Sequence, residues 1–125
     1  MTMDIKGLPI LCMDFDGVIH QYIQPWQGAD VIPDEPVEGA FEFLIQAMEK
    51  FRVAIYSARS GQEGGISAMK AWFIEKGFEF TDSLYFPETK PPAFISIDDR
   101  CLTFNGVFPD VQDLIDFKPW NKRGV

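Results

Sequence analysis

Short apolar runs alternate with amphipathic segments along this chain. Three of the runs, at 8–13, 51–56 and 93–97, are bounded by polar residues and are too short for helices, so they predict buried β-strands. Weaker runs at 83–86 and 101–104 predict two further strands. The chain is therefore expected to contain a sheet of several short strands.

Two segments between these runs carry apolar residues at helical spacing. The first spans 36–50 and starts at a proline, which suits a first helical turn because its missing N–H would have no partner there. The second spans 66–76 and is followed by Gly77, a typical residue after a helix end. A short closing helix is expected at 109–117. The apolar faces are Phe41, Leu44, Ile45 and Met48 in the first helix and Ile66, Met69 and Phe73 in the second.

The alternation of strands and helices favours an α/β fold whose mainly parallel sheet is covered on both faces. The near-continuous apolar strands agree, because a strand buried on both sides needs no polar positions. A proline-rich loop at 20–36 separates the first strand from the first helix. With 125 residues, the chain suits a single domain spanning 1–125. The polar tail at 118–125 is expected to be frayed.

The composition narrows the class of protein. Hydrophobic residues make up 46% and charged residues 24%, as in ordinary globular proteins. The formal net charge of -8 disfavours a general nucleic-acid binder, which carries the opposite charge. Cys12 and Cys101 belong to no CxxC motif and are expected to be reduced, largely buried thiols. Without a signal peptide or an apolar run near ~20 residues, the protein is expected to be soluble and cytoplasmic, with no membrane partner.

Three of the predicted strands are followed by a polar residue, namely Asp14, Ser57 and Asp98. In an open parallel sheet, ligands bind beyond the carboxyl ends of the strands, so these side chains are expected to meet at one edge. Asp16 and Asp99 add two more acids nearby. Carboxylates this close repel one another unless a cation or a proton intervenes. An all-oxygen cluster with room for water suits Mg²⁺.

The same residues suggest how a phosphate ester would be hydrolysed. A carboxylate beside Mg²⁺, here Asp14, can act as a nucleophile on phosphorus. Ser57 can donate a hydrogen bond to a phosphoryl oxygen, and Lys90 can neutralise the charge that develops there. Asp16 can give a proton to the leaving group and later take one from water. We therefore expect a phosphomonoester phosphatase that forms an aspartyl-phosphate intermediate on Asp14.

Four parts of the chain, at 14–18, 53–57, Lys90 and 97–99, resemble the four motifs of the haloacid dehalogenase-like (HAD) hydrolase superfamily. They occur in that family's order and span residues 10 to 99, which is most of the chain. An isolated DxD pair is a weak signal, whereas the ordered set is specific. The sequence is therefore identified as resembling a HAD-like hydrolase.

The resemblance also assigns roles to individual residues. It implies that Asp14 is the nucleophile, that Asp16 is the acid/base, and that Ser57 and Lys90 bind phosphate. It further implies that Mg²⁺ is the cofactor, held by Asp14, the main-chain carbonyl of Asp16 and Asp98, with Asp99 assisting.

The fold that the resemblance implies is a Rossmann-like, three-layer α/β fold with the first strand central. Larger family members carry a cap domain, but the gaps at 20–36 and 60–88 are too short or too filled for one, so the chain resembles the small capless type. In that family an open site favours macromolecular substrates or closure by a partner subunit. The expected partner is a phosphorylated substrate, either a small molecule or a nucleic-acid end, and the sequence leaves the oligomeric state open.

For each of four residues near the proposed site, the sequence leaves two interpretations open. Arg59 either binds substrate phosphate or forms a surface ion pair. His20 has a structural or surface role in preference to proton transfer. Tyr22 and Trp26 either pack against the domain or stack on a substrate base.

Two other functions are weighed against a phosphatase. A HAD-like binding or regulatory module without turnover would keep the fold, but the intact set of acids argues against it. A receiver-like phospho-acceptor domain also uses clustered acids and Mg²⁺. However, receivers place the lysine last in order, whereas Lys90 precedes Asp98 here.

Overall fold

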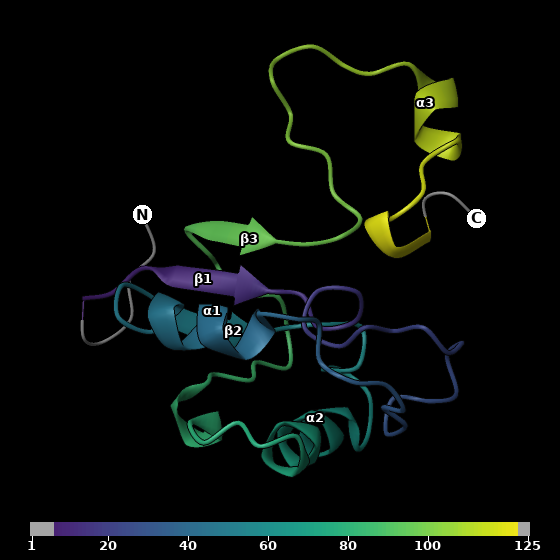
Figure 1. Ribbon diagram of the computed structural model, residues 1–125. Coiled ribbons are helices and arrows are strands. Elements are labelled where there is room, and N and C mark those ends of the chain that lie inside the picture. The colour runs from purple at the N-terminus through teal and green to yellow at the C-terminus, as the bar shows by residue number, and fades with distance from the viewer. Residues whose placement is uncertain (1–6, 123–125) are drawn as a thin grey trace.

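The computed structural model describes residues 7–122 and contains a three-stranded parallel sheet (Figure 1). The strands are β1 (Ile10–Met13), β2 (Arg52–Ile55) and β3 (Ile95–Ile97). β1 lies between the other two, and it pairs with both in parallel. The prediction of a small α/β fold with a parallel sheet is confirmed.

The register of the sheet brings the carboxyl ends of the strands together. Met13 at the end of β1 lies opposite Ile55 on one side and Ile97 on the other. The pairing continues one residue further, because Asp14 N donates to Ile97 O at 2.9 Å and Tyr56 N donates to Met13 O at 3.0 Å. The residues that follow the three strands therefore leave the sheet at the same edge.

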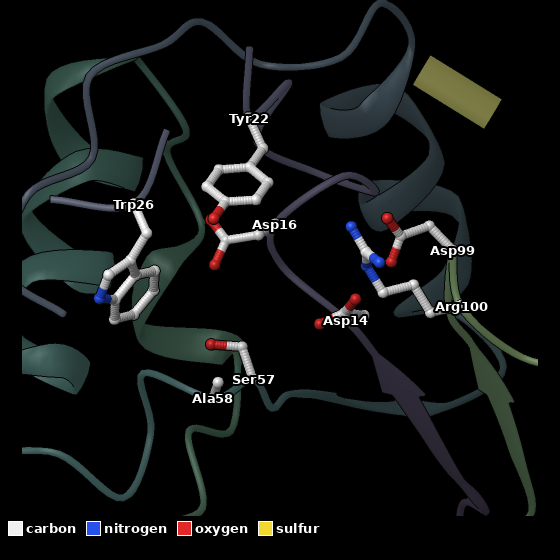
Figure 2. A pocket seen from close by; sticks show the side chains of 8 residues that line it. All are labelled: Asp14, Asp16, Tyr22, Trp26, Ser57, Ala58, Asp99 and Arg100. Carbon is white, nitrogen blue, oxygen red and sulfur yellow. The ribbon is translucent and has the colours of Figure 1, made fainter. Parts of the chain in front are cut away.

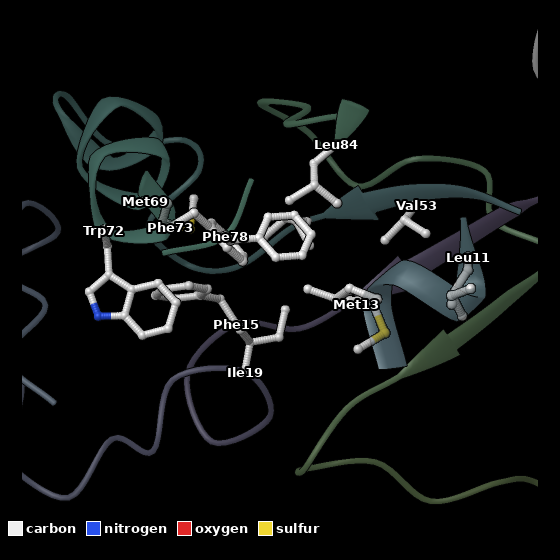
Figure 3. Close-up of a cluster of buried hydrophobic side chains, with 13 residues drawn as sticks. Leu11, Met13, Phe15, Ile19, Val53, Met69, Trp72, Phe73, Phe78 and Leu84 are labelled. Atoms are coloured by element: carbon white, nitrogen blue, oxygen red, sulfur yellow. The ribbon is translucent and has the colours of Figure 1, made fainter. Parts of the chain in front are cut away.

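Helices α1 (Ala40–Ala47) and α2 (Gly65–Glu75) share one apolar core with β1 and β2 (Figure 3). Aromatic rings fill much of this core. Phe73 has a centroid distance of 5.9 Å to Phe15, 5.3 Å to Trp72 and 5.5 Å to Phe78. Each fully buried ring contributes roughly 1.5–3 kcal/mol through removal from water. The core thus fixes the two helices and the end of β1 relative to one another.

The helical predictions are confirmed in type, but the first helix is shorter than expected. α1 begins at Ala40, because the chain from Pro36 to Gly39 is irregular and Gly39 adopts a left-handed conformation. Leu44 is fully buried, whereas Ile45 is 43% exposed, so the prediction that Ile45 lies on the core face is wrong.

The strand predicted at 83–86 is reduced to a single parallel bridge beside β2. Tyr85 N donates to Val53 O at 2.9 Å, and Ile55 N donates to Tyr85 O at 2.8 Å. The run at 93–97 forms β3, but all three residues of β3 are exposed. The expectation of burial on both faces therefore holds for β1 and is wrong for β3.

After β3, the chain extends away from the sheet and then returns to it (Figure 1). No strand forms at 101–104, so that prediction is wrong, and Cys101 is exposed instead of buried. The closing helix is α3 (Val111–Ile115), which is capped by the side chain of Asp110. Every residue from 100 to 118 is exposed.

Up to Lys122 the end of the chain is anchored to the rest of the protein, so the prediction of a frayed tail is wrong for these residues. Pro119 is buried, and a short 3₁₀ turn, η2 (Trp120–Lys122), follows it. Trp120 Nε1 donates to Gly17 O at 2.6 Å, and Asn121 Nδ2 donates to Gln21 O at 3.1 Å. The rest of the predicted tail, 123–125, lies outside the described residues.

Among residues 7–122, no helix has the length and apolar character needed to cross a membrane.

Candidate functional site

The chain turns sharply as it leaves β1, and this turn shapes the site. Phe15 is fully buried, and its carbonyl accepts hydrogen bonds from Ile19 N and His20 N, both at 2.9 Å. Gly17 has a φ of 83°, which favours glycine. A Cβ at Gly17 would clash with the Asp99 carboxylate. A glycine is therefore required here for Asp99 to come close to the turn.

Three carboxylates gather at this edge of the sheet. Asp14, Asp98 and Asp99 each place one oxygen within 4.8 Å of the others. The pKa of Asp14 is raised to about 8, chiefly by burial and also by a hydrogen bond with Asp99 and the nearby charge of Asp98. Repulsion between like charges therefore destabilises the cluster when all three acids are ionised.

One atom of this cluster has no partner inside the protein. Asp99 Oδ1 is buried and accepts no hydrogen bond from any described residue. A buried carboxylate oxygen without a partner carries a large desolvation penalty, which a bound cation or an ordered water removes. Three carboxylates with one free oxygen form a donor set that suits a hard divalent ion such as Mg²⁺.

The fourth predicted acid, Asp16, faces a different set of partners. Its carboxylate accepts hydrogen bonds from Arg59 Nε at 2.9 Å and Arg59 Nη2 at 3.0 Å, and it contacts His20 Nδ1 at 2.9 Å. Burial on its own would raise the pKa of Asp16. The hydrogen bonds from His20 and Arg59, together with the charge of Arg59, outweigh burial and hold that pKa below its usual range.

His20 is fully buried, and its hydrogen bonds define its tautomer. The backbone N–H of Asp34 donates to His20 Nε2 at 3.0 Å, so Nε2 carries no proton. Nδ1 therefore holds the proton and donates it to Asp16 at 2.9 Å. The ring also stacks on Phe15 at a centroid distance of 5.5 Å. This arrangement supports the structural interpretation of His20.

For Arg59 the sequence left phosphate binding and a surface ion pair open, and in the structure Arg59 forms a buried ion pair with Asp16. Its side chain is only 1% exposed. Besides binding Asp16, its Nη1 donates to the carbonyls of Gly28, Ala29 and Val31 at 2.9–3.0 Å. Because these acceptors engage the guanidinium, Arg59 is placed to hold the loop at 20–36 rather than a substrate.

Ser57 and Lys90, the two predicted phosphate ligands, are placed differently. Ser57 is buried and lines the same pocket as Asp14 and Asp16, and its Oγ accepts from Arg59 N at 3.0 Å. Lys90 is exposed and is not among the residues that line this pocket. No described carboxylate pairs with Lys90 within 4 Å. A contact between Lys90 and phosphate stays a prediction.

The resulting pocket has a volume of about 190 Å³ (Figure 2). In Figure 2 the rings of Tyr22 and Trp26 stand on one side of the space, and Asp99 and Arg100 stand on the other. Sequence reasoning did not select Arg100 as a site residue. Its position directly after the Asp98-Asp99 pair is the signal that would have done so. The lining residues are Asp14, Asp16, Tyr22, Trp26, Ser57, Ala58, Asp99 and Arg100.

Comparisons with protein-family models, with curated proteins and with solved structures gave no match to this chain.

Proposed function

We propose that this chain is a Mg²⁺-dependent phosphohydrolase of the capless HAD-like type, with Asp14 as the nucleophile. One observation supports this most strongly. Asp14, Asp16, Ser57 and Asp99 come from three distant parts of the sequence and line one pocket at the carboxyl edge of a parallel sheet. The central position of β1, which carries Asp14 at its end, is in keeping with that family.

The proposed reaction has two steps. In the first, an oxygen of Asp14 forms a bond to phosphorus while the bond to the leaving oxygen breaks, and Asp16 gives that oxygen a proton. In the second, water attacks phosphorus, Asp16 takes a proton from the water, and the bond to Asp14 breaks. The products are an alcohol and inorganic phosphate, and Asp14 is restored.

The metal would be held by Asp14, Asp98 and Asp99, whose oxygens already lie close together. When bound, Mg²⁺ neutralises part of the charge on the attacking carboxylate and on the phosphoryl oxygens. The unpartnered Asp99 Oδ1 supports a cation at this position. Ser57, which lines the same pocket, offers a hydroxyl to a phosphoryl oxygen.

The surroundings of Asp16 favour its role in the second step. Held by Arg59 and His20, Asp16 is an ionised carboxylate and can accept a proton from water. To act as the acid in the first step, it must first acquire a proton, which its lowered pKa opposes. We therefore expect substrates with good leaving groups, which need little protonation, to react faster than alkyl phosphates.

The test is hydrolysis of p-nitrophenyl phosphate with Mg²⁺ by the wild type and by Asp14→Asn. We expect the substitution to lower kcat by about three orders of magnitude or more, because the nucleophile is removed. Asp82→Asn is the matched control, since Asp82 is an exposed aspartate in the 3₁₀ turn η1 (Thr81–Ser83), which contributes nothing to the pocket. Equal rates in Asp14→Asn and the wild type would refute the assignment.

Turnover must also be separated from binding alone. Acid quenching during steady-state hydrolysis is expected to trap phosphate covalently on the wild type and not on Asp14→Asn. Mg²⁺ binding with no hydrolysis of any phosphate ester would favour a silent module. Persistent labelling by acetyl phosphate without turnover would favour a phospho-acceptor domain.

A further inference from the structure

The wall of the pocket opposite Asp99 and Arg100 is aromatic. It consists of the rings of Tyr22 and Trp26, both from the loop at 20–36 (Figure 2). Trp26 is 42% exposed, although the molecule has an apolar core that holds other large aromatic rings. A half-exposed indole beside a cluster of acids is a surface that can contact a ligand.

Tyr22 is held in an unfavourable backbone conformation. Its φ is 56°, and it is the one non-glycine residue with positive φ among residues 7–122. Bulky residues rarely adopt this conformation, and it persists only where the surrounding structure enforces it. Such strain is concentrated at binding and catalytic sites. Here it accompanies a ring that lines the pocket.

Buried polar groups hold this loop in place. Asp34 is 8% exposed, and its carboxylate accepts from the backbone N–H groups of Ile23 and Gln24 at 2.7 and 2.9 Å. On the other side of Trp26, Arg59 binds the carbonyls of Gly28, Ala29 and Val31. The loop is therefore tied down just before and just after Trp26, so its rings are positioned before a ligand arrives.

Arg59 also contacts the indole ring of Trp26 directly. Its guanidinium carbon lies 4.6 Å from the centroid of the Trp26 ring, within the range of a cation–π contact. The same guanidinium binds Asp16 through Nε and Nη2. One buried side chain thus sets the distance between the aromatic wall and a predicted catalytic carboxylate.

The size of the pocket limits what it can enclose. Its volume of about 190 Å³ is below the roughly 300–1,000 Å³ of pockets that hold a whole small-molecule ligand. The space suits a phosphoryl group beside the acids, with the rest of the ligand extending along the two rings. A ligand that uses this wall must carry a flat apolar face close to its phosphate.

We propose that the substrate is a nucleotide phosphate monoester whose base stacks on Trp26 and Tyr22. This inference rests on the proposed function, because it assigns the leaving group of that reaction. Every nucleic-acid base has a π-face, so stacking on an aromatic side chain does not depend on which base is present. The net charge of -8 disfavours tracking along a strand, so the ligand is a mononucleotide or a single terminal nucleotide.

The experiment compares kcat/KM for a nucleoside monophosphate with that for glycerol phosphate, which lacks a ring. In the wild type the nucleotide is preferred. In Trp26→Leu the ratio of the two values falls about 5- to 150-fold, as expected for loss of one stacked base. The matched control is Phe80→Leu, because Phe80 is also a half-exposed ring (45%) but does not line the pocket. That variant keeps the wild-type ratio.

Further substrates distinguish the source of the nucleotide. The kcat/KM for a short oligonucleotide with a terminal phosphate is compared with that for the mononucleotide. A higher value for the oligonucleotide identifies a strand end as the substrate, and a higher value for the mononucleotide identifies a free nucleotide. A preference for glucose 6-phosphate over every nucleotide overturns the inference. An equal loss of both activities in Trp26→Leu also overturns it, because stacking acts only on the ligand with a base.

A binding measurement separates this inference from the proposed reaction. Adenosine, which carries no phosphate for the acids to repel, is titrated into the protein without Mg²⁺ and is expected to quench tryptophan fluorescence in the wild type and not in Trp26→Leu. Quenching without hydrolysis of any phosphate ester would refute the reaction and keep the nucleotide site. Hydrolysis of phosphate esters with no nucleotide preference and no quenching would refute the nucleotide site and keep the reaction.

Discussion

Two regions of this molecule have similar hydrophobic content but opposite burial. The body, residues 8–97, contains the sheet and both long helices, and its core residues are at most 8% exposed. The arm, residues 98–118, is also rich in apolar side chains, yet every residue from 100 to 118 is exposed. The exposed large apolar residues of the arm are Leu102, Phe104, Val107, Phe108, Val111, Leu114, Ile115 and Phe117.

Burial in this protein therefore depends on the length and packing partners of an element more than on its apolar content. α2 has three turns that present Met69, Trp72 and Phe73 to the strands. α3 has five residues, and Asn105-Gly106 separates it from β3. The chain exposes 8207 Å², whereas compact proteins of 14.2 kDa expose about 6,800 Å². The larger surface is in keeping with an extended arm.

The largest expected effect comes from a cavity in the core of the body. Phe73→Ala removes a fully buried ring that contacts Phe15, Trp72 and Phe78. We expect it to lower the free energy of unfolding by about 3–5 kcal/mol. Urea denaturation followed by circular dichroism measures this value. A loss below about 1 kcal/mol would contradict the central role of this core.

A smaller effect is expected where the body holds its loop through Arg59. Arg59→Met leaves Asp16 without its cationic partner and frees the carbonyls of Gly28, Ala29 and Val31. We expect a loss of about 2–4 kcal/mol, since breaking a buried ion pair leaves an uncompensated charge. Arg100→Met is the control on the arm side, because Arg100 is exposed. Equal losses in the two variants would show that Arg59 does not hold the loop.

Magnesium is expected to stabilise the junction between body and arm, where Asp14 meets Asp98 and Asp99. At ten times its Kd, a ligand adds about 1.4 kcal/mol to the free energy of unfolding. The pKa of Asp14 is about 8 in the folded protein, against an ordinary value of 3.8 for an aspartate. Without metal, the stability from this group is complete below about pH 4 and is lost as the pH rises through 8.

The sign of this linkage makes the metal effect dependent on pH. Because Mg²⁺ needs the ionised carboxylate, protons compete with it. The increase in Tm on adding Mg²⁺ should therefore be larger at pH 8 than at pH 6, and EDTA should reverse it. Asp99→Asn should reduce the increase. Equal increases at both pH values would contradict a site that includes Asp14.

The smallest effect is expected in the arm itself. Phe108→Ala removes a ring that is 86% exposed, in contrast to the same change at Phe73. We expect the free energy of unfolding to change by less than about 0.5 kcal/mol, as is usual for surface positions. The same urea denaturation measures it. A loss above about 2 kcal/mol would mean that the arm is packed in solution.

Much of the candidate site followed from the sequence because its acids come directly after strands. A parallel sheet brings the carboxyl ends of strands together, so Asp14, Ser57 and Asp98 were expected at one edge. In the structure Asp14 lies near Asp98, and Asp14 and Ser57 line the same pocket. The role of Arg59 was not predictable in this way, because its carbonyl partners lie about thirty residues earlier in a loop without a regular pattern.

The elements of the body and the order of its acids were predictable from local pattern, because strand and helix periodicity and turn residues act over a few neighbouring positions. Three features could be seen only in the folded chain: Arg59 is buried against the protein, Tyr22 has a positive φ, and residues 100–118 are exposed. These outcomes depend on contacts between residues far apart in the chain, and no local pattern specifies which distant groups will meet.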